Sequence, residues 1–373
     1  MSRTYRMAII GVGGIAQLHA RAIQDLPNAQ LIAGSCRTPD KGQAFAKQWS
    51  CQWFPDYQAM LDEVKPDVVT IATPSGAHLE PLLACAQRGI HVICEKPIEI
   101  NVDRIQQMLD AAASAQIMLG GIFPLRFKPA NQVLHQAMAQ GRFGKSFVIS
   151  VAVPWWRDDA YYAPNRWQGT LALDGGGALM NQSIHLVDQL QWLTAAASPD
   201  SDPHANPVQD VFCLTGKLGH DPSLIEVEDT ALAVARLRSG SLAQVLAATS
   251  MYPGTQTSIT VSSREGAVQI VGEQITLWQF RDERPEDDQI RQRFAQPTQH
   301  SGGASDPLAI PYQPHRDNFA QFLDALDHGR PPAIDGPEAA KAVAIVQACY
   351  ESAASGQPVQ PPRVRTPADT PSR

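Results

Sequence analysis

Residues 5–26 read YRMAIIGVGGIAQLHARAIQDL, and this stretch decides the fold of the first part of the chain. It begins with a short apolar run, Ala8–Ile10, which predicts a buried strand. A cluster of glycines follows and is typical of a tight turn. After the turn, apolar residues recur at helical spacing and predict an amphipathic helix. The residues on its expected packing face are Ile15, Leu18, Ala22 and Leu26.

The glycine cluster has the spacing of a dinucleotide-binding fingerprint. In the segment GVGGIA, Gly11 permits the turn, Gly13 lets the backbone approach a pyrophosphate, and Ala16 keeps the helix close to the strand. The start of the helix offers free N–H groups to phosphates. Glycine turns also serve packing alone, but the position between a strand and a helix favours cofactor binding. The candidate cofactor residues in this turn are Gly11, Gly13, Gly14, Ile15 and Ala16.

Strands and helices alternate through the rest of residues 1–124. The expected strands lie at 29–37, 66–73, 90–95 and 116–123, and the expected helices at 39–49, 75–89 and 101–115. Strict alternation implies right-handed crossovers and a doubly wound parallel sheet. The sequence therefore predicts an α/β Rossmann domain over residues 1–124.

The strand His91–Cys94 ends abruptly in Glu95, Lys96 and Pro97. Polar residues and a proline also close ordinary strand ends. In a parallel sheet, however, ligands bind at the carboxyl ends of the strands, and the glycine turn lies on that same edge. Lys96 is therefore a candidate for ligand contact, whereas Glu95 is expected to pair locally.

The end of the second strand bears on the choice between NAD and NADP. Folds selective for NAD usually carry an acidic residue there, about 20 residues after the glycines, which binds the ribose hydroxyls. This chain has Cys36 instead, between Ser35 and Arg37, with Thr38 and Lys41 close behind. Cationic donors suit a 2′-phosphate, so the sequence favours NADP, with NAD also possible. The alternative interpretation is that Arg37 is only a solvated loop cation.

From residue 125 onward the pattern changes to strands that follow one another without helices between them. Strand-like runs lie at 145–156, 210–218, 228–251, 257–272 and 274–280. Such an order predicts an α+β domain with a large, mainly antiparallel sheet over residues 125–361, followed by a tail at 362–373. The polar segments 198–210 and 281–307 are interpreted as surface insertions.

A glycine-rich entry, Gly175–Gly177, leads into a second candidate helix. On it, Asn181, His185 and Asp188 recur at a spacing that predicts one shared face. A lone buried histidine is usually structural, but a histidine flanked by two polar residues favours a site. No second histidine, cysteine or glutamate follows at metal-ligand spacing near His185, so no metal is predicted there.

The segment 154–170, PWWRDDAYYAPNRWQGT, combines aromatic rings with arginines. Aromatic faces suit the C–H side of a pyranose, and arginine suits a carboxylate or phosphate. A packed loop is the alternative interpretation of the same residues. The candidate substrate residues of the chain are Lys96, Trp155, Arg157, Arg166, Trp167, Asn181 and His185.

Composition limits the class of protein. The chain has 373 residues, 44% of them hydrophobic, which is enough for two domains with sizeable cores. A formal net charge of −7 argues against nucleic acid or an anionic membrane as the main partner, and no apolar run is long enough to span a membrane. Six cysteines without a C-x-x-C pair are interpreted as reduced thiols in a cytoplasmic protein.

The sequence resembles the glucose-fructose oxidoreductase / inositol dehydrogenase (Gfo/Idh/MocA) superfamily from residue 5 to about residue 361. The residues that carry the resemblance are Gly11–Ala16, Thr73, Pro74, His78, Glu95–Pro97, Gly175–Gly177, His185 and Asp188. The resemblance implies hydride transfer between NAD(P) and a secondary alcohol of a sugar, sugar derivative or cyclitol. It also implies an open sheet that covers the substrate and forms a homodimer or homotetramer.

The resemblance assigns roles by position. Lys96 corresponds to the lysine that contacts the reacting hydroxyl, and His185 to the histidine that acts as acid and base. Many family members carry aspartate four residues before that histidine, where this chain has Asn181, which can form hydrogen bonds but carries no charge. A similar departure occurs in the branch that includes nucleotide-sugar-acid 3-dehydrogenases. The expected cofactor set is completed by Ser35, Arg37, Thr73, Pro74, His78, Glu95 and Lys96.

Two other functions remain open from the sequence. One is a glycosidase that uses bound NAD for transient oxidation, as one branch of the superfamily does. The other is a non-catalytic sensor that binds the cofactor, although a sensor is expected to lose Lys96 or His185, and both are present.

Overall fold

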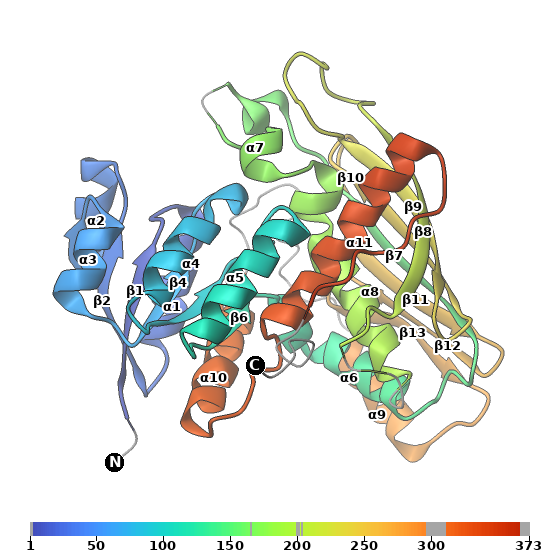
Figure 1. Cartoon of the computed structure of the whole chain (residues 1–373). Coiled ribbons are helices and arrows are strands. Elements are labelled where there is room, and N and C mark those ends of the chain that lie inside the picture. The colour runs from blue at the N-terminus through green and yellow to red at the C-terminus, as the bar shows by residue number, and fades with distance from the viewer. Residues whose placement is uncertain (1–2, 165, 199–201, 203, 296–310, 366–373) are drawn as a thin grey trace, which may run out of the picture. The chain divides into compact units, whose positions relative to one another are not determined.

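The computed structural model of the protein describes residues 3–164, 166–198, 202, 204–295 and 311–365. The described chain divides into two compact units, and Figure 1 colours both along the sequence. The first comprises residues 3–124, 311–340 and 364–365, and the second comprises the described residues of 125–295 together with 341–363. Of the expected tail, residues 366–373 lie outside the described residues.

The first unit contains a six-stranded sheet with the order β3-β2-β1-β4-β5-β6, in which all the pairings are parallel. Its strands are β1 (Tyr5–Ile10), β2 (Ala29–Ser35), β3 (Gln52–Phe54), β4 (Val68–Ile71), β5 (His91–Cys94) and β6 (Leu119–Gly121). The connecting helices are α1 (Gly14–Gln24), α2 (Pro39–Trp49), α3 (Tyr57–Val64), α4 (Leu79–Ala86) and α5 (Val102–Ser114). The strand order reverses beside β1, so the predicted Rossmann fold is confirmed. Strand β3 and helix α3 have no counterpart in the sequence prediction, because β3 is too short to show a periodic pattern.

Helix α1 packs through a face that differs in part from the predicted one. Ala16, His19 and Ala20 are fully buried, whereas Ile15 and Leu18 remain partly exposed. Small side chains let the helix approach the sheet and helix α10 closely, so the tightest contact is made by alanines rather than by the largest apolar residues.

Helix α10 (Gln313–Asp327) packs on the first unit, although the division of the sequence at residue 124 assigned it to the second domain. Phe319, Phe322 and Leu323 are buried in the same core cluster as strand β1. Ile334, which follows α10, accepts a backbone hydrogen bond of 2.8 Å from Gly121 of β6. The apolar face of a helix packs on whichever core lies nearest in space, which sequence order does not reveal.

The second unit contains a seven-stranded sheet with the order β13-β12-β11-β7-β10-β9-β8. Its strands are β7 (Phe147–Pro154), β8 (Val208–Gly216), β9 (Thr230–Leu237), β10 (Leu242–Ala248), β11 (Ser258–Ser263), β12 (Gly266–Val271) and β13 (Gln274–Phe280). Strands β7 and β10 pair in parallel and the other neighbours are antiparallel. The predicted α+β fold with a mainly antiparallel sheet is therefore confirmed.

Helices cover one face of this sheet. Figure 1 shows α8 (Ile184–Ala196) and α6 (Pro129–Ala139) against it, and α8 contacts β7. The remaining helical segments of the unit are η3 (Asp159–Tyr162), α7 (Leu171–Asp174), η4 (Ala178–Gln182), α9 (Pro285–Phe294) and the later part of α11 (Gly336–Ser355). On the opposite face, large apolar side chains are exposed along four adjacent strands. They are Val148, Phe212, Leu214, Leu232, Val234 and Leu242.

The segment 281–307 is not wholly a surface insertion, because helix α9 lies within it. The carboxylate of Asp287 is buried and accepts hydrogen bonds from Arg142 at 2.5 and 2.8 Å and from the Trp278 indole at 2.6 Å. A buried ion pair with an additional donor ties this polar helix to the sheet. Residues 296–307 lie outside the described residues.

All six cysteines are free, and Cys85, Cys94, Cys213 and Cys349 are buried. None of the helices in the described parts of the chain combines the length and apolar character that a membrane span needs.

Candidate functional site

The glycine turn connects β1 to α1 and is shaped by contact with the loop after β4. Gly11 has a φ of +96°, and a Cβ atom on it would lie 2.6 Å from the carbonyl carbon of Ala72, so only glycine fits there. A Cβ atom on Gly13 would meet nothing within 4 Å. Gly11 is therefore required by the protein itself, whereas the space at Gly13 is open to a ligand. Gly14 and Ile15 begin α1, and Ala16 is fully buried against the sheet.

The end of β2 lies beside this turn. The N–H group of Gly11 donates to the carbonyl oxygen of Ser35 at 2.9 Å, and the Ser35 side chain is buried. Arg37 is exposed and follows directly, while the Cys36 thiol donates to the carbonyl oxygen of Thr38 at 3.4 Å. Cys36 therefore stands where NAD-selective folds carry an acid, and an exposed cation follows it.

His78 holds two loops at the carboxyl edge of the sheet together. Its Nε2 atom lies 3.0 Å from the carbonyl oxygen of Thr73, and its Nδ1 atom lies 3.0 Å from that of Pro97. The ring is buried, so it supports the Thr73–Pro74 loop and the Lys96–Pro97 corner.

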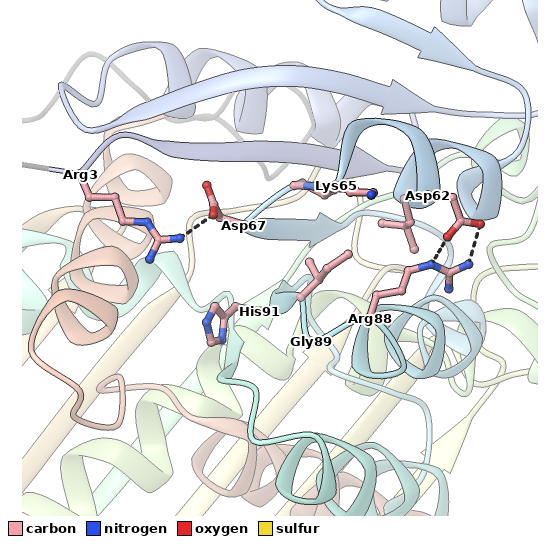
Figure 2. Close-up of a pocket in the computed structure, with 10 residues that line it drawn as sticks. Arg3, Asp62, Lys65, Asp67, Arg88, Gly89 and His91 are labelled. Carbon is pink, nitrogen blue, oxygen red and sulfur yellow. Dashed lines mark hydrogen bonds and ion pairs between the residues drawn. The ribbon is translucent and has the colours of Figure 1, made fainter.

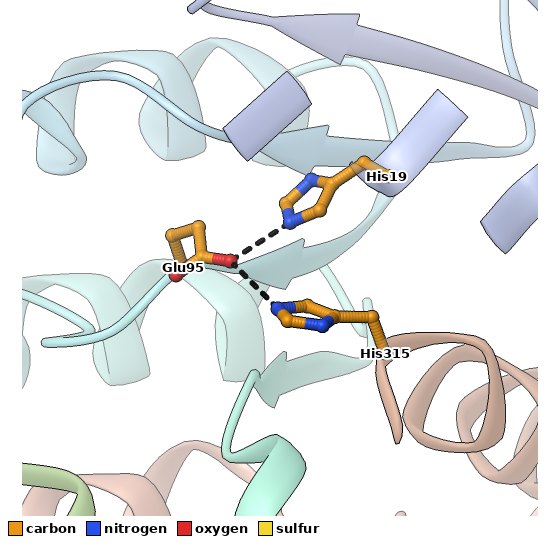
Figure 3. A group of neighbouring side chains, drawn as sticks. All are labelled: His19, Glu95 and His315. Carbon is orange, nitrogen blue, oxygen red and sulfur yellow. Dashed lines mark hydrogen bonds and ion pairs between the residues drawn. The ribbon is translucent and has the colours of Figure 1, made fainter. Parts of the chain in front are cut away.

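Lys96 follows β5 and is half-buried, next to a buried carboxylate. One oxygen of Glu95 accepts the N–H group of Lys96 at 3.1 Å, and the other lies 2.8 Å from Nε2 of His19 and 3.9 Å from Nε2 of His315 (Figure 3). Burial raises the pKa of Glu95, but the hydrogen bond from His19 and the nearby cationic groups outweigh it and lower the pKa to about 2. Glu95 is thus an ionised group that pairs within the first unit.

Sequence reasoning missed both histidines of this cluster. His19 lies in the helix after the glycine turn, one turn beyond Ala16, where a polar residue on the packed face could have been noticed. His315 lies at the start of α10, some 220 residues after Glu95 in the chain, and no local pattern connects the two.

The glycines that precede η4, Gly176 and Gly177, pack closely against other residues of the second unit. A Cβ atom on Gly176 would lie 2.1 Å from the Tyr350 hydroxyl, and one on Gly177 would lie 1.6 Å from the Glu228 carbonyl oxygen. The Glu228 carboxylate accepts the N–H groups of Gly177 and Leu179, both at 2.9 Å. Burial raises the pKa of Glu228 to about 7 despite these bonds. The backbone at Gly176 and Gly177 therefore packs closely against Tyr350 and Glu228.

Asn181 and Asp188 do not share a site as the spacing predicted. Asn181 lies in the π-helical segment η4, which changes the helical phase before α8 begins. Its Nδ2 atom donates to the buried carboxylate of Asp174 at 2.7 Å. Asp188 is fully buried and accepts two hydrogen bonds from Arg126, at 2.5 and 2.8 Å, so it is part of the core. His185 stands half-buried in the first turn of α8.

A carboxylate that the sequence analysis did not consider contacts Asn181. Asn181 itself carries no acid, but Asp174, the last residue of α7, accepts the hydrogen bond of its amide. A carboxylate acceptor also fixes which end of the Asn181 amide points toward it, since only the NH₂ group can donate.

Arg157, one of the predicted substrate residues, is buried and makes several contacts within its loop and with η4. Its guanidinium lies 4.9 Å from the centroid of the Trp155 ring and 5.5 Å from that of Tyr161, and it donates to the side-chain oxygen of Gln182 at 3.1 Å. Arg166 is exposed beside Gln168, with which it forms a hydrogen bond of 3.3 Å, and Trp167 is partly buried. Arg157 and Arg166 both approach the Tyr161 ring, so this loop gathers two cations.

The candidate residues fall into two groups. The glycine turn, Arg37 and Lys96 belong to the first unit, and their loops follow β1, β2 and β5 at the carboxyl edge of one sheet. Arg157, Asn181 and His185 belong to the second unit.

A cavity of about 380 Å³ lies at the opposite edge of the first sheet, before β4 and β5 (Figure 2). Its charged groups are largely paired, with Arg3 bonded to Asp67 at 2.6 Å and Arg88 to Asp62 at 2.7 Å. Ligands of doubly wound sheets bind at the carboxyl edge, so this cavity is separate from the candidate site.

Comparison with known proteins agrees with this arrangement. Residues 5–121 match the model of an oxidoreductase family with an NAD-binding Rossmann fold, and residues 131–269 match the GFO/IDH/MocA C-terminal domain. The WlbA dehydrogenase of Bordetella pertussis, solved with NADH and UDP-GlcNAcA, is 30% identical with a TM-score of 0.82, over 96% of this chain and 99% of that one.

Curated relatives include two dehydrogenases. The myo-inositol 2-dehydrogenase of Thermotoga maritima is 23% identical over 93% of this chain and 96% of its own length. The D-glucoside 3-dehydrogenase of Escherichia coli is 28% identical over 65% of this chain and 69% of its own length. With both family domains matched and a solved relative aligned over nearly its full length, the chain belongs to the Gfo/Idh/MocA family of nicotinamide-dependent oxidoreductases.

Proposed function

We propose that this protein is a dehydrogenase that transfers hydride between NAD(P) and a secondary alcohol of a nucleotide sugar or its acid. The observation that carries the proposal is the position of Lys96. It follows β5 at the carboxyl edge of the sheet, the edge at which the glycine turn also lies. The substrate class is supported by the WlbA relative, which was solved with UDP-GlcNAcA, and by the two cations at Arg157 and Arg166. Arginine suits both the carboxylate and the diphosphate of such a molecule.

The proposed chemistry divides between cofactor and protein. A nicotinamide cofactor would be held at the glycine turn, Gly11 to Ala16, and would supply the hydride acceptor for oxidation of the carbon that carries the hydroxyl. The cation of Lys96 stabilises the developing charge on the substrate oxygen, and His185 takes the proton. Asn181, held by Asp174, is proposed to orient the same oxygen by a hydrogen bond.

Net reduction of added cofactor tests the proposal. The purified protein is incubated with NAD or NADP and with UDP-GlcNAcA, free hexoses or myo-inositol, and the absorbance of reduced nicotinamide is followed. We expect reduction with the nucleotide sugar acid and little with free sugars. Release of a sugar from a glycoside without net cofactor reduction would instead identify a glycosidase. Cofactor binding with no turnover of any substrate would favour a sensor.

We further propose that the protein binds NADP more tightly than NAD. The support is the exposed Arg37 beside Cys36 at the end of β2, where an acidic residue is missing. Replacing Arg37 by alanine should weaken NADP binding by about tenfold, since a charge-assisted contact contributes about 1.5 kcal/mol, and leave NAD binding unchanged. Fluorescence titration with both cofactors measures this. The WlbA relative was solved with NADH, so NAD is the alternative cofactor. If the wild type binds NAD more tightly than NADP, and Arg37→Ala does not change this, the preference for NADP is refuted.

The exposed apolar face of the second sheet is proposed to pair with a second copy of this chain. Phe212 lies opposite Val234, and Leu214 lies opposite Leu232, so the apolar side chains form a continuous patch across β8 and β9. Monomers rarely expose such a patch, and a two-fold dimer needs only one self-complementary surface.

Charged substitutions on this face are expected to separate the copies. The double variant Leu232→Asp, Val234→Lys should run as a monomer in size-exclusion chromatography with light scattering, while the wild type runs as a dimer or larger assembly. Leu171→Asp is the matched control, because Leu171 is equally exposed but lies on α7, away from the sheet. A wild type that is already monomeric at micromolar concentration would refute the proposed interface.

A further inference from the structure

The three side chains His19, Glu95 and His315 converge inside the first unit, as Figure 3 shows. Among the residues that the structure describes, they are the one group of three or more His, Cys, Asp and Glu side chains whose ligand atoms all lie within 4.8 Å of one another. All three residues are at most 6% exposed. Burying polar side chains costs free energy unless they form hydrogen bonds. The hydrogen bonds of this cluster therefore show which groups it holds in place.

Hydrogen-bonding contacts connect β4 to Lys96 through His19 and Glu95. The hydroxyl of Thr70 lies 3.1 Å from Nδ1 of His19, and Nε2 of His19 lies 2.8 Å from one oxygen of Glu95. Because an ionised carboxylate can only accept, Nε2 of His19 carries a proton and donates it to Glu95. The second oxygen of Glu95 then accepts the backbone N–H group of Lys96 at 3.1 Å.

Only a carboxylate can occupy the position of Glu95 in this chain of bonds. It receives N–H donors on both of its ends, from His19 on one oxygen and from Lys96 on the other. A glutamine of the same shape has one oxygen and one NH₂ group, so one of the two donors would face another donor. His315, with Nε2 at 3.9 Å, adds a second imidazole on the His19 side.

We propose that Thr70, His19, Glu95 and His315 form a positioning network that fixes the backbone of Lys96, and thereby directs its ammonium group to the substrate hydroxyl. The inference rests on the proposed function, because it assigns these four residues to the orientation of the lysine that the proposal makes catalytic. Their part is indirect, since Glu95 holds the lysine through its main chain and the others hold Glu95. A misplacement of a reacting group by about 1 Å costs up to about 100-fold in rate, which sets the scale of the expected effects.

Thr70→Val is the most specific test. Valine keeps the shape of the buried threonine but removes the hydroxyl that lies beside Nδ1 of His19. We expect kcat to fall about 10-fold, with the affinity for the cofactor and the thermal midpoint nearly unchanged. NMR of isotope-labelled histidine should show the proton of His19 still on Nε2, where the Glu95 carboxylate accepts it, and a shifted Nδ1 resonance, because Nδ1 has lost its partner. An unchanged kcat together with the shifted Nδ1 resonance would overturn the proposal.

Glu95→Gln and two variants of His19 test whether a conservative substitution preserves turnover. Glu95→Gln should lower kcat by about 10- to 100-fold, because one of the two donors loses its acceptor. His19→Gln places an amide N–H near the position of Nε2 and should retain most of the turnover, whereas His19→Leu should lose it. A purely structural role predicts instead that kcat follows the thermal midpoint in all of these variants, and that result would overturn the proposal.

Two comparisons separate this inference from its alternatives. If Lys96→Met is inactive while Thr70→Val and Glu95→Gln are fully active, the inference fails and the proposed function stands; if Lys96→Met is active, the proposed function itself fails. Elemental analysis tests the alternative that His19, His315 and Glu95 bind a metal ion. Stoichiometric zinc whose removal lowers turnover would make these residues metal ligands and overturn the positioning role.

Discussion

Replacing Lys96 by methionine is expected to lower turnover by about two to three orders of magnitude, because an interaction with developing charge on oxygen contributes about 3–4 kcal/mol. Methionine keeps most of the length and bulk of the lysine stem and removes only the cation. Folding and cofactor affinity should therefore survive. Steady-state kinetics with the true substrate, together with cofactor titration and a thermal melt, would measure all three quantities.

The control for this variant is Lys47→Met on the exposed surface of α2, which removes a lysine charge from the same unit without approaching the carboxyl edge. His185→Ala should also lower turnover, and its pH–rate profile should lose one limb, since histidine ordinarily titrates near neutral pH. If both groups serve one proton transfer, the double variant will lose less than the product of the two single losses. Near-normal turnover of Lys96→Met would refute the catalytic role of Lys96 and favour the alternative that Glu95–Pro97 only closes a strand.

The largest expected effect on stability comes from Gly177→Ala. The added methyl group would lie 1.6 Å from the Glu228 carbonyl oxygen, which is backbone and cannot rotate away. Making room would break the bond from the Ala178 N–H group to that oxygen, at 3.1 Å, and strain the bonds to the Glu228 carboxylate. Overpacking and a lost buried hydrogen bond together cost about 3–5 kcal/mol, so the melting midpoint of this 373-residue chain should fall by about 4–6 °C.

Gly13→Ala is the matched control, because it adds the same methyl group where the protein leaves open space. Its free energy of unfolding should change by about 1 kcal/mol at most, as expected for alanine in place of glycine at a helix N-cap. Cofactor affinity should fall, since the methyl group would stand where the pyrophosphate is proposed to approach. A Gly177→Ala protein as stable as the wild type would show that the loop can shift freely and that its glycines are not needed for packing.

Local sequence patterns determined the order and type of most elements. A glycine turn between an apolar strand and a helix has few alternatives, because positive φ at Gly11 and helical spacing after it are both local properties. The alternation of strands and helices then implies a parallel sheet, and a parallel sheet places the loops that contain Gly13 and Lys96 on one edge. In the second half, strands follow one another without helices between them, and this order predicted the mainly antiparallel sheet.

The same patterns could not determine which segments meet. His315 reaches Glu95 because α10 returns to the first unit, and Asp174 reaches Asn181 because a π-helical segment shifts the helical phase. Asp188, predicted beside the site, is instead paired with Arg126 in the core. Periodicity shows that a face is polar or apolar, but a hydrogen bond needs its partner within about 3 Å and in line with the donor. That condition is set by packing between segments distant in sequence, so the sequence by itself determined the fold and the edge that binds ligands, whereas the tertiary structure decided the partners of each polar side chain.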